Sequence, residues 1–371
     1  MNDLVCLDMP CGPIMVERIR RAWDEGDAVF PLDQRLPAPA RDSVLASVRP
    51  TVMALPHDDI RIGGEPVQPG DAVVVATSGT TGDPKGVVLT HDAVRASAFA
   101  TSRRLNVSSS DKWLACLPPS HVGGLGVILR SIVTDTPLVA VDGFSVESYD
   151  LAADHGATLV SLVATALSRV DASKYRTIVL GGARPPIDRP SNVVTTYGMT
   201  ETGSGVVYDG VPLDGVEVRI VDGIVHVRCP MLLRAYRDGT VPVDADGWFR
   251  TGDIGTFDDG VLAVQGREGD LIITGGENVW PDQVEEVLRT HPGVADVCVV
   301  GVEDPEWGNA VHAWIVVHPG SSVVLDGVRD HVKQFLPAHC APRAVHVATT
   351  IPRTNLGKPR RAELVARVPR G

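Results

Sequence analysis

TSGTTGDPKG, residues 77 to 86, is a run of hydroxyl side chains and glycines that ends on a lysine and a glycine. The small and apolar residues 72–76 precede it, so we expect a buried strand that reaches the surface near the start of this run. His91 then begins an amphipathic stretch that continues to Leu105 and predicts a helix. The sequence therefore predicts a phosphate-binding loop at the exit of a strand.

The residue types in this loop are suited to an anion. Glycines let the backbone turn its N–H groups toward one ligand, hydroxyls add donors, and a lysine adds a mobile cation. The residues expected to contact phosphate are Thr77, Ser78, Gly79, Thr80, Thr81 and Lys85. The pattern GxxxxGK followed by Ser or Thr does not fit, because Pro84 replaces its second glycine and Gly86 follows the lysine. A kinase-type or GTPase-type loop is therefore disfavoured, and the ordinary alternative is a low-complexity turn.

The composition is that of an acidic globular protein. With 371 residues, 44% of them hydrophobic, the chain suggests two or three domains with a sizeable core. The formal net charge is −12 and the basic runs, such as PRR at 359–361, are short, so nucleic acid is disfavoured as a partner. The six cysteines contain no CxxC pair and predict reduced, mostly buried thiols. An acidic N-terminus and the lack of a long apolar run predict a cytosolic, cytoplasmic protein with no stable membrane insertion.

The order of the apolar runs predicts an α/β protein with two unequal domains. From Ala72 to about Val194, such runs alternate with helical patterns, which is typical of an α/β core. Short alternating strands over 216–264 suggest an antiparallel or barrel-like annex. After Gly266 a small α+β unit begins, with a helix that starts at Pro281. We therefore expect a large domain at 1–266 and a small mobile domain at 267–371, with a hinge at 267–270.

Several separated motifs occur in the order that is typical of the acyl-adenylate-forming superfamily. They are TSGTTGDPKG at 77–86, LGGA at 180–183, TTYGMTET at 195–202, TGDIG at 251–255, GREGDLIITGGENVWPDQVE at 266–285 and PRTNLGK at 352–358. From about Asp71 to its end the chain therefore resembles this superfamily of acyl- and aryl-CoA synthetases, peptide-synthetase adenylation domains and luciferases. The resemblance implies their fold and the ligands ATP, Mg²⁺ and CoA. The stretch ahead of the phosphate loop is short for this superfamily, so a compact N-terminal half is expected.

Most of the matching residues are assigned to nucleotide binding by this resemblance. Beyond the phosphate loop, they are Gly181, Gly182, Ala183, Thr196, Tyr197, Gly198, Met199, Thr200, Asp253 and Arg267. Tyr197 would stack on adenine, Asp253 would accept from the ribose hydroxyls, and Glu201 would hold Mg²⁺. Each of the three has an ordinary alternative, namely a core aromatic, a turn aspartate and a helix-entry residue.

The resemblance also implies a reaction in two steps. Lys358 lies in a stretch without periodicity, where a solvated lysine would be the ordinary reading. By its position in the family it would bind the carboxylate and the α-phosphate while an acyl-AMP forms. A rotation of the small domain would then present a second loop to the thiol, with Gly275, Gly276, Glu277 and Asn278. Gly269 stands at the hinge where the family usually has Asp or Lys, which permits rotation and leaves its latching open.

One arginine within an apolar segment is the clue to the acid substrate. In LPPSHVGGLGVILRSI at 117–132, Arg130 either snorkels to the surface or binds a buried anion, and composition alone favours the surface. The spacing of His121 and Arg130 resembles the o-succinylbenzoate–CoA ligases of menaquinone synthesis. SLVATALSRV at 161–170 does so too, although two alanines replace the Pro and Gln of that pattern. The resemblance implies that Arg130 recognises the ring carboxylate of 2-succinylbenzoate, and that His121 and Ser161 line the pocket.

Three alternatives stay open at this point. The first is another aryl- or acyl-CoA ligase, and the second is an enzyme that charges a carrier-protein thiol. The third is a nucleotide-binding regulatory protein that has lost its chemistry, against which the intact Lys85, Glu201 and Lys358 argue. The oligomeric state is also open, a homodimer included.

Overall fold

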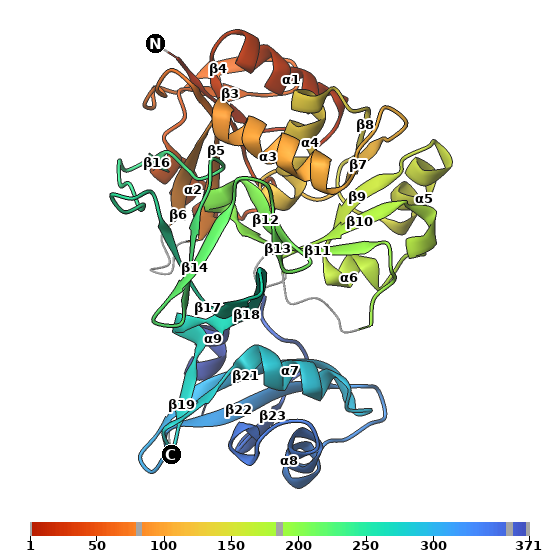
Figure 1. The fold of residues 1–371 in the computed structure, drawn as a ribbon, viewed down its shortest axis with the longest axis vertical. Helices are drawn as coiled ribbons and strands as arrows, with labels where there is room; N and C mark the ends of the chain where they lie inside the picture. The colour runs from red at the N-terminus through yellow and green to blue at the C-terminus, as the bar shows by residue number, and fades with distance from the viewer. Residues whose placement is uncertain (1, 79–83, 183–187, 354–358, 369–371) are drawn as a thin grey trace. The chain divides into compact units, whose positions relative to one another are not determined.

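The computed structural model describes residues 2–78, 84–182, 188–353 and 359–368 (Figure 1). The chain forms two compact units. Unit 1 consists of Met1–Arg219, His226–Arg250 and Asp258–Leu262, and unit 2 consists of Ile220–Val225, Thr251–Phe257 and Ala263–Gly371. Within the described residues, no helix is both long and apolar enough to cross a bilayer.

The first sheet of unit 1 has seven strands in the order β16-β6-β5-β2-β1-β3-β4. These strands are β1 (Leu4–Leu7), β2 (Ala28–Pro31), β3 (Val52–Ala54), β4 (Asp59–Arg61), β5 (Asp71–Ser78), β6 (Pro84–Thr90) and β16 (Ala235–Tyr236). Its central pairs are parallel, whereas β6 and β16 add antiparallel strands at one edge. The residues of β2 and of the first half of β5 are buried, as expected for strands covered on both faces.

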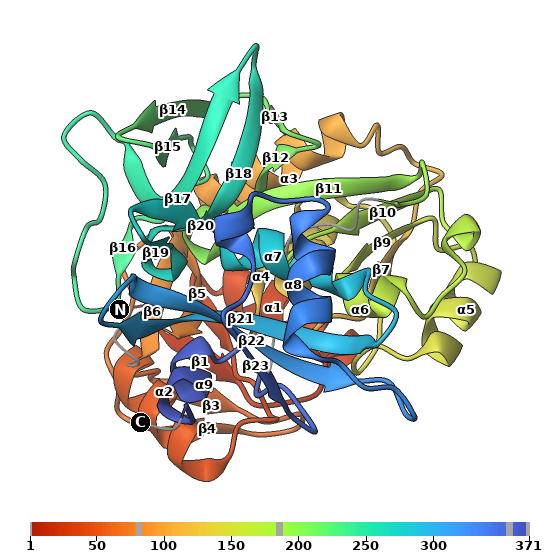
Figure 2. The same cartoon turned by 90° about the horizontal axis from the view of Figure 1, so that it is seen from below.

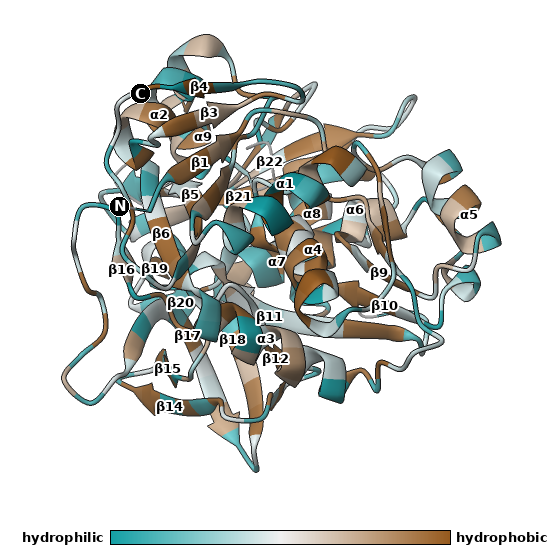
Figure 3. Cartoon of the chain, turned by 90° about the horizontal axis from the view of Figure 1, so that it is seen from above, coloured by the Kyte–Doolittle hydropathy of each residue, from teal (hydrophilic) through white to brown (hydrophobic). Residues whose placement is uncertain are grey.

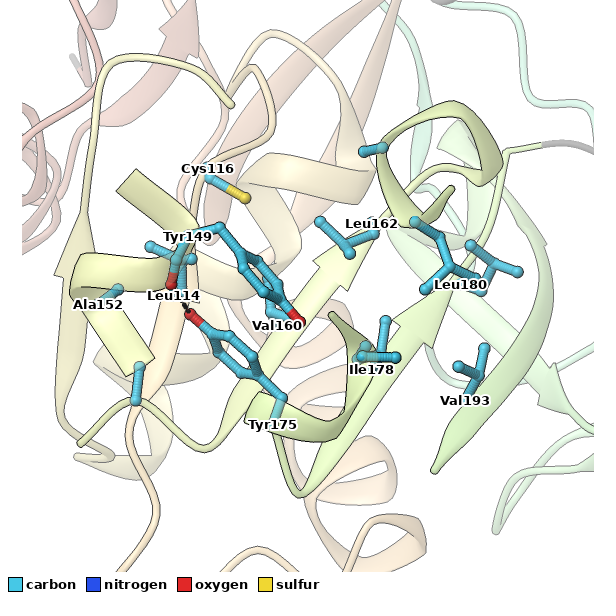
Figure 4. Packing of buried hydrophobic residues seen from close by; sticks show 14 residues of the cluster. Leu114, Cys116, Tyr149, Ala152, Val160, Leu162, Tyr175, Ile178, Leu180 and Val193 are labelled. Carbon is cyan, nitrogen blue, oxygen red and sulfur yellow. Dashed lines mark hydrogen bonds between the residues drawn. The ribbon is translucent and has the colours of Figure 1, made fainter. Parts of the chain in front are cut away.

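The second sheet of unit 1 also has seven strands, in the order β13-β12-β11-β10-β9-β7-β8. They are β7 (Trp113–Ala115), β8 (Leu138–Ala140), β9 (Leu159–Leu162), β10 (Thr177–Leu180), β11 (Val193–Met199), β12 (Ser204–Tyr208) and β13 (Val211–Pro212). β7 to β11 are parallel, as the alternation of strands and helices predicts. Figure 4 shows the core on one face of this sheet, where the rings of Tyr149 and Tyr175 lie 4.5 Å apart.

Helices cover these two sheets. They are α1 (Pro13–Asp24), α2 (Ala38–Val48), α3 (His91–Arg104), α4 (Val122–Thr134), α5 (Val146–Asp154) and α6 (Ala164–Leu167), with short 3₁₀ turns at Ala172–Lys174 and Thr200–Thr202. α3 begins where predicted, because the hydroxyl of Thr90 accepts a hydrogen bond from the Ala93 N–H at 3.1 Å. α4 differs in being apolar around most of its circumference (Figure 3), and all residues from Gly124 to Ser131 are buried.

A third sheet contains the strands β14 (Glu217–Val221), β15 (Ile224–Arg228), β17 (Phe249–Asp258) and β18 (Val261–Arg267). Their order is β14-β15-β17-β18. In the described residues this sheet has two free ends and does not close on itself. The antiparallel or barrel-like annex predicted for 216–264 is therefore an open sheet and not a barrel.

The sheet of unit 2 is sandwiched between helices. Its strands are β19 (Ile272–Thr274), β20 (Glu277–Val279), β21 (Val294–Asp304), β22 (Gly308–Val317) and β23 (Ala344–Val347), and its helices are α7 (Pro281–Arg289), α8 (Leu325–Lys333) and α9 (Arg361–Ala366), with 3₁₀ turns at Glu268–Asp270 and Ala338–Cys340. Figure 2 shows β21, β22 and β23 side by side. Alternate residues of β21 face opposite ways: Val297 and Val299 pack with α7 and α8, whereas Cys298 and Val300 pack with Leu364 of α9.

The predicted α/β class is confirmed. The helix predicted to start at Pro281 begins there, with the proline in its first turn. The six cysteines are free, and five of them are buried.

Candidate functional site

The phosphate-binding segment predicted at 77–86 connects two paired strands. β5 and β6 are antiparallel, and Thr77 lies opposite Lys85. The lysine therefore belongs to the returning strand of a hairpin, an arrangement that the prediction of a strand exit did not include. The backbone of Ser78 ends β5, while Gly79, Thr80, Thr81 and the side chain of Ser78 lie outside the described residues.

Two neighbouring strands of the second sheet bring the next group of predicted residues together. β10 ends at Leu180, and Gly181 and Gly182 follow it, the latter with φ +87°. The Thr196 hydroxyl, on the adjacent strand β11, donates to the Leu180 carbonyl at 3.2 Å. A Cβ atom at Gly181 would lie 2.8 Å from that hydroxyl oxygen, so glycine is required for this close approach. Ala183 lies outside the described residues.

The end of β11 is irregular where the predicted adenine and phosphate residues lie. The register with β12 shifts between Tyr197 and Gly198, as in a β-bulge. A Cβ atom at Gly198 would lie 2.2 Å from the Ser204 carbonyl oxygen, which only glycine avoids. Met199 ends the strand and Thr200 begins a 3₁₀ turn, so the chain leaves the sheet at these positions.

Glu201, in this turn, is held by a segment that the sequence did not single out. The Leu233 N–H donates to its carbonyl oxygen at 2.7 Å, and the Tyr236 hydroxyl donates to its carboxylate Oε1 at 3.0 Å. The ammonium of Lys85 lies 5.3 Å from the centre of the Tyr236 ring. The structure therefore joins Lys85 and Glu201, two residues predicted to meet the phosphates and the metal, through one tyrosine.

The donor set around Glu201 fits magnesium. The described residues contain no group of three or more His, Cys, Asp and Glu side chains that could form an all-protein metal cage. Mg²⁺ is usually bound through one or two carboxylates, with substrate phosphates and water completing its shell. A single carboxylate that shares a tyrosine partner with Lys85, the lysine predicted to bind phosphate, therefore suits Mg²⁺ shared with ATP.

Arg130 is buried, which corrects the surface placement that composition favoured. Its exposed fraction is 3%, because α4 is enclosed along this length. Nη2 lies 3.5 Å from the Ser204 hydroxyl, and the guanidinium carbon lies 4.9 Å from the centre of the Trp113 ring. Nε and Nη1 have no hydrogen-bond partner in the described structure. Burial lowers the pKa of the guanidinium, but an arginine stays charged, so this group is a buried cation with free donors.

A small cavity between α3 and α4 has Arg130 among its lining residues. Its volume is about 20 Å³, enough for about one water molecule. The walls are mostly apolar and include Leu89, Leu125, Leu129 and Met231. Among the described residues of this lining, Arg130 is the one that is charged, and charge interactions are strong in such an apolar surrounding.

The other two predicted substrate residues do not line this cavity. His121 is the residue before α4, with Nε2 3.7 Å from Asp33 Oδ2. Nine residues of helix rise about 13 Å, so Arg130 lies about that far along α4 from His121, which precedes its first residue. Burial opposes ionisation of Asp33, but the hydrogen bonds from Arg35 hold the pKa of that carboxyl well below its usual range. Ser161 is buried in β9, opposite Val179 of β10.

In unit 2, the two residues predicted to flank the ribose lie next to each other. Arg267 Nε is 3.3 Å from Asp253 Oδ1, an ion pair between β18 and β17. The Asp253 N–H donates to the Thr251 hydroxyl at 3.0 Å, and that hydroxyl donates to the Val225 carbonyl at 2.8 Å. These bonds fix the backbone of Asp253 on its strand, and Arg267 lies beside its carboxylate.

The loop predicted to face the thiol is a hairpin turn. Gly275 and Gly276, with φ +58° and +83°, connect β19 to β20, and Thr274 pairs with Glu277. Positive φ at both central residues is the geometry of a type I′ turn, which favours glycine. Glu277 and its neighbour Asn278 are exposed.

Two further predictions concern the ends of this small unit. A side chain added at Gly269 would meet nothing within 4 Å, so the hinge position has room for one. Lys358 lies outside the described residues. On either side of the undescribed segment 354–358, Arg353 pairs with Pro359 in an isolated β-bridge. The Arg361 guanidinium lies 3.0 Å from the buried Glu285 carboxylate.

Comparison with known proteins gives two family matches. The family model described as AMP-binding enzyme matches residues 39–224. The model described as AMP-binding enzyme C-terminal domain matches residues 283–358.

Individual relatives extend this similarity over most of the chain. A protein of Mycobacterium tuberculosis (strain CDC 1551 / Oshkosh) named "Probable 2-succinylbenzoate--CoA ligase" is 39% identical over 366 residues, which cover 89% of this chain and 94% of the relative. The o-succinylbenzoate CoA synthetase from Bacillus subtilis, in complex with the acyl-adenylate intermediate OSB-AMP, has a TM-score of 0.87 at 28% identity, covering 98% of this chain and 88% of that one. The same enzyme in complex with ATP and magnesium ion has a TM-score of 0.86 at 28% identity, covering 98% and 89%.

Proposed function

The chain belongs to the AMP-binding enzyme family, and from this membership we propose that it is an ATP- and Mg²⁺-dependent acid–thiol ligase, an o-succinylbenzoate–CoA ligase of menaquinone synthesis. It would activate the succinyl carboxylate of 2-succinylbenzoate as an acyl-AMP and then transfer the acyl group to CoA. The names of its relatives and the ligand of the Bacillus subtilis synthetase support this choice of acid.

The observation that carries the proposal is the buried guanidinium of Arg130. An isolated buried charge costs several kcal/mol unless a counter-charge is supplied. The described residues offer Arg130 only a hydroxyl at 3.5 Å and an aromatic ring. The ring carboxylate of 2-succinylbenzoate would supply the missing counter-charge, directly or through a water. A fatty acid, whose one carboxylate must face ATP, would leave the guanidinium unpaired.

The nucleotide would be bound by the residues that the family motifs mark. We propose that the hairpin carrying Thr77 and Lys85 holds the phosphates, that Tyr197 stacks on adenine, and that Asp253 and Arg267 hold the ribose. The backbone at Gly181 and Gly182 and at 196–200 would complete this site. Glu201 would hold Mg²⁺, which neutralises phosphate charge when it is bound with ATP.

The chemistry then has two steps. The succinyl carboxylate attacks the α-phosphorus of ATP, its bond to pyrophosphate breaks, and acyl-AMP forms. The CoA thiol, after losing its proton, attacks the acyl carbonyl, and AMP leaves as the thioester forms. We propose that Lys358 stabilises the charge that develops on the phosphate oxygens in the first step.

Both steps would use one cleft through a rotation of the small domain. We propose domains at 1–266 and 267–371 with a hinge at 267–270, and a thiol-facing role for Gly275, Gly276, Glu277 and Asn278 in the second step. His121 and Ser161 would line the acid pocket together with Arg130. Because ATP and CoA are cytoplasmic metabolites, we also propose a cytoplasmic enzyme. A homodimer is the oligomeric state that light scattering should test first.

A comparison of acids tests the proposal. The full chain is mixed with ATP, Mg²⁺, CoA and one acid, and both pyrophosphate and CoA thioester are measured. We expect 2-succinylbenzoate to react with a far higher kcat/KM than benzoate or hexanoate. Equal turnover of all three would remove the menaquinone assignment, and adenylation without a CoA thioester would favour a carrier-protein acceptor.

A further inference from the structure

The short strand β16 brings Tyr236 to the lysine of the phosphate-binding hairpin. In the register of β16 with β6, Tyr236 lies opposite Val87. Lys85 is two residues before Val87 and therefore on the same face of β6. A tyrosine and a lysine in this diagonal relation are within reach of each other across antiparallel strands, which accounts for the 5.3 Å between the ammonium and the ring centre.

The same tyrosine is bonded to the carboxylate predicted to hold the metal. Its hydroxyl donates to Glu201 Oε1 at 3.0 Å. A carboxylate has two oxygens, so this bond to Oε1 does not occupy the second one, Oε2. The Leu233 N–H, three residues before Tyr236, donates to the carbonyl oxygen of Glu201. One segment, 233–236, thus fixes both the backbone and the side chain of Glu201.

This segment is itself anchored on both sides of the tyrosine. Before it, Arg234 Nε and Nη2 donate to the two carboxylate oxygens of Asp71 at 2.8 and 2.9 Å, and Asp71 is 1% exposed. After it, the Arg237 N–H donates to the Gly86 carbonyl at 2.7 Å, and the Arg237 side chain donates to the carbonyls of Val48 and Glu65. Bidentate arginine bonds and strand pairing leave Tyr236 little freedom, so its hydroxyl stands at a fixed point.

We propose that Tyr236 is a positioning residue for the metal–triphosphate site, which holds Glu201 in the orientation that receives Mg²⁺ with ATP. This inference rests on the proposed function, because it takes Glu201 as the metal-binding carboxylate. A partner that orients a metal-binding carboxylate commonly changes metal affinity by about 10- to 100-fold when it is removed. We expect loss of the hydroxyl to weaken Mg²⁺-dependent binding of ATP and to leave the affinity for the acid unchanged.

Calorimetric titration of ATP into the full chain, once with excess Mg²⁺ and once with EDTA, separates these effects. The quantity of interest is the gain in ATP affinity that Mg²⁺ provides. In Tyr236→Phe, which keeps the ring and loses only the hydroxyl, we expect this gain to fall about ten-fold. ATP binding in EDTA should be unchanged, and that measurement also reports whether the variant is folded.

Tyr149→Phe is the matched control. The Tyr149 hydroxyl donates to the Asp171 carbonyl at 3.0 Å, the same length as the bond to Glu201, but it lies in the core behind the second sheet (Figure 4). Its loss should leave the gain from Mg²⁺ unaltered. An equal fall in both variants would overturn the inference, because a missing tyrosine hydroxyl would then act only through general stability.

Glu201→Gln separates the inference from the function on which it rests. We expect this variant to lose the gain from Mg²⁺, and Tyr236→Phe to add nothing in its background. If Glu201→Gln loses the gain and Tyr236→Phe keeps it, the role of Tyr236 is refuted and the ligase proposal stands. If both variants keep the gain, Glu201 does not hold the metal, and the roles proposed for Glu201 and for Tyr236 are both refuted. Loss of ATP binding in EDTA by Tyr236→Phe would likewise refute a role limited to the metal.

Discussion

Replacing Arg130 by methionine should weaken binding of the acid without weakening the fold. An arginine usually contributes to stability through its partners, but Nε and Nη1 of Arg130 have none in the described structure. Methionine has a similar length, fits an apolar surrounding and brings no charge. The variant therefore removes a buried cation and keeps most of the packing around α4.

The magnitude follows from the contacts. Each unsatisfied buried donor costs about 1–3 kcal/mol, so the substitution relieves roughly 2–6 kcal/mol. Loss of the interaction with the Trp113 ring, 4.9 Å away, opposes this by about 0.5–2 kcal/mol. The free energy of unfolding should thus stay unchanged or rise by up to roughly 5 kcal/mol. For the acid, loss of one charged hydrogen bond of about 1.5–3 kcal/mol should lower kcat/KM roughly 10- to 150-fold.

Arg176→Met is the contrasting variant, because Arg176 has a complete set of partners. Its Nε and Nη2 donate to the two oxygens of Asp111 at 2.9 Å each, and the Asp111 side chain is 4% exposed. Removing this guanidinium leaves a buried carboxylate without its counter-charge. We expect the free energy of unfolding to fall by about 3 kcal/mol, while the KM for 2-succinylbenzoate stays the same.

Urea unfolding and pyrophosphate release are measured on the wild-type protein, Arg130→Met and Arg176→Met. Hexanoate serves as the reference acid, since it has no second carboxylate for Arg130 to bind. The reasoning is refuted if Arg130→Met is destabilised as strongly as Arg176→Met, or if its kcat/KM falls equally for both acids. Either result would make Arg130 a structural arginine.

Acid titration, the lysine of PRTNLGK and one glycine give three more tests. Burial raises the pKa of Asp111, but the Arg176 hydrogen bonds outweigh this effect and lower the pKa to about 2. The stability that the ionised carboxylate contributes should therefore be complete above pH ~4 and fall by roughly 2 kcal/mol toward pH ~2. Urea unfolding at a series of pH values would measure this fall. Lys358→Ala should slow acyl-AMP formation by about 10²- to 10³-fold and spare thioester formation from supplied acyl-AMP; equal losses in the two half-reactions would contradict the domain rotation. Gly198→Ala should reduce ATP binding and lower the unfolding temperature, because its Cβ would lie 2.2 Å from a carbonyl oxygen, whereas Gly269→Ala, with nothing within 4 Å, should do neither.

The parts of the fold that depend on neighbouring residues could be predicted from the sequence. α3 begins at His91 because a threonine caps it and its apolar residues have helical spacing. The hairpin around 77–86 was predicted only in part, since the pairing of Thr77 with Lys85 depends on which strand β6 joins. The open sheet at 217–267 was also beyond the pattern, because short alternating strands are equally typical of barrels and of open sheets.

In the candidate site, too, some residues could be predicted from the sequence and others could not. Motif order located Glu201, Asp253 and Arg267, and the structure places the last two in contact. Composition alone favoured a surface position for Arg130, because an arginine is usually exposed, whereas the resemblance to the ligases placed it in a pocket; the packing of α4 on all sides buries it. The apolar character of VGGLGVIL around the whole helix was the available signal. For Tyr236 no local signal exists, since its bond to Glu201 joins residues 35 positions apart.

The way in which buried charges are paired gives the strongest reason to connect Arg130 with a ligand. Asp71, Asp111 and Glu285 are buried carboxylates, and each has an arginine within 3.0 Å. These pairs are complete in the free chain, as the cost of burying an isolated charge requires. Arg130 breaks this pattern, although an apolar residue at its position would make the free chain at least as stable. A group that opposes stability in the free chain is expected to have its favourable interaction with a ligand, and we propose that a second carboxylate on the substrate would supply the counter-charge that Arg130 lacks.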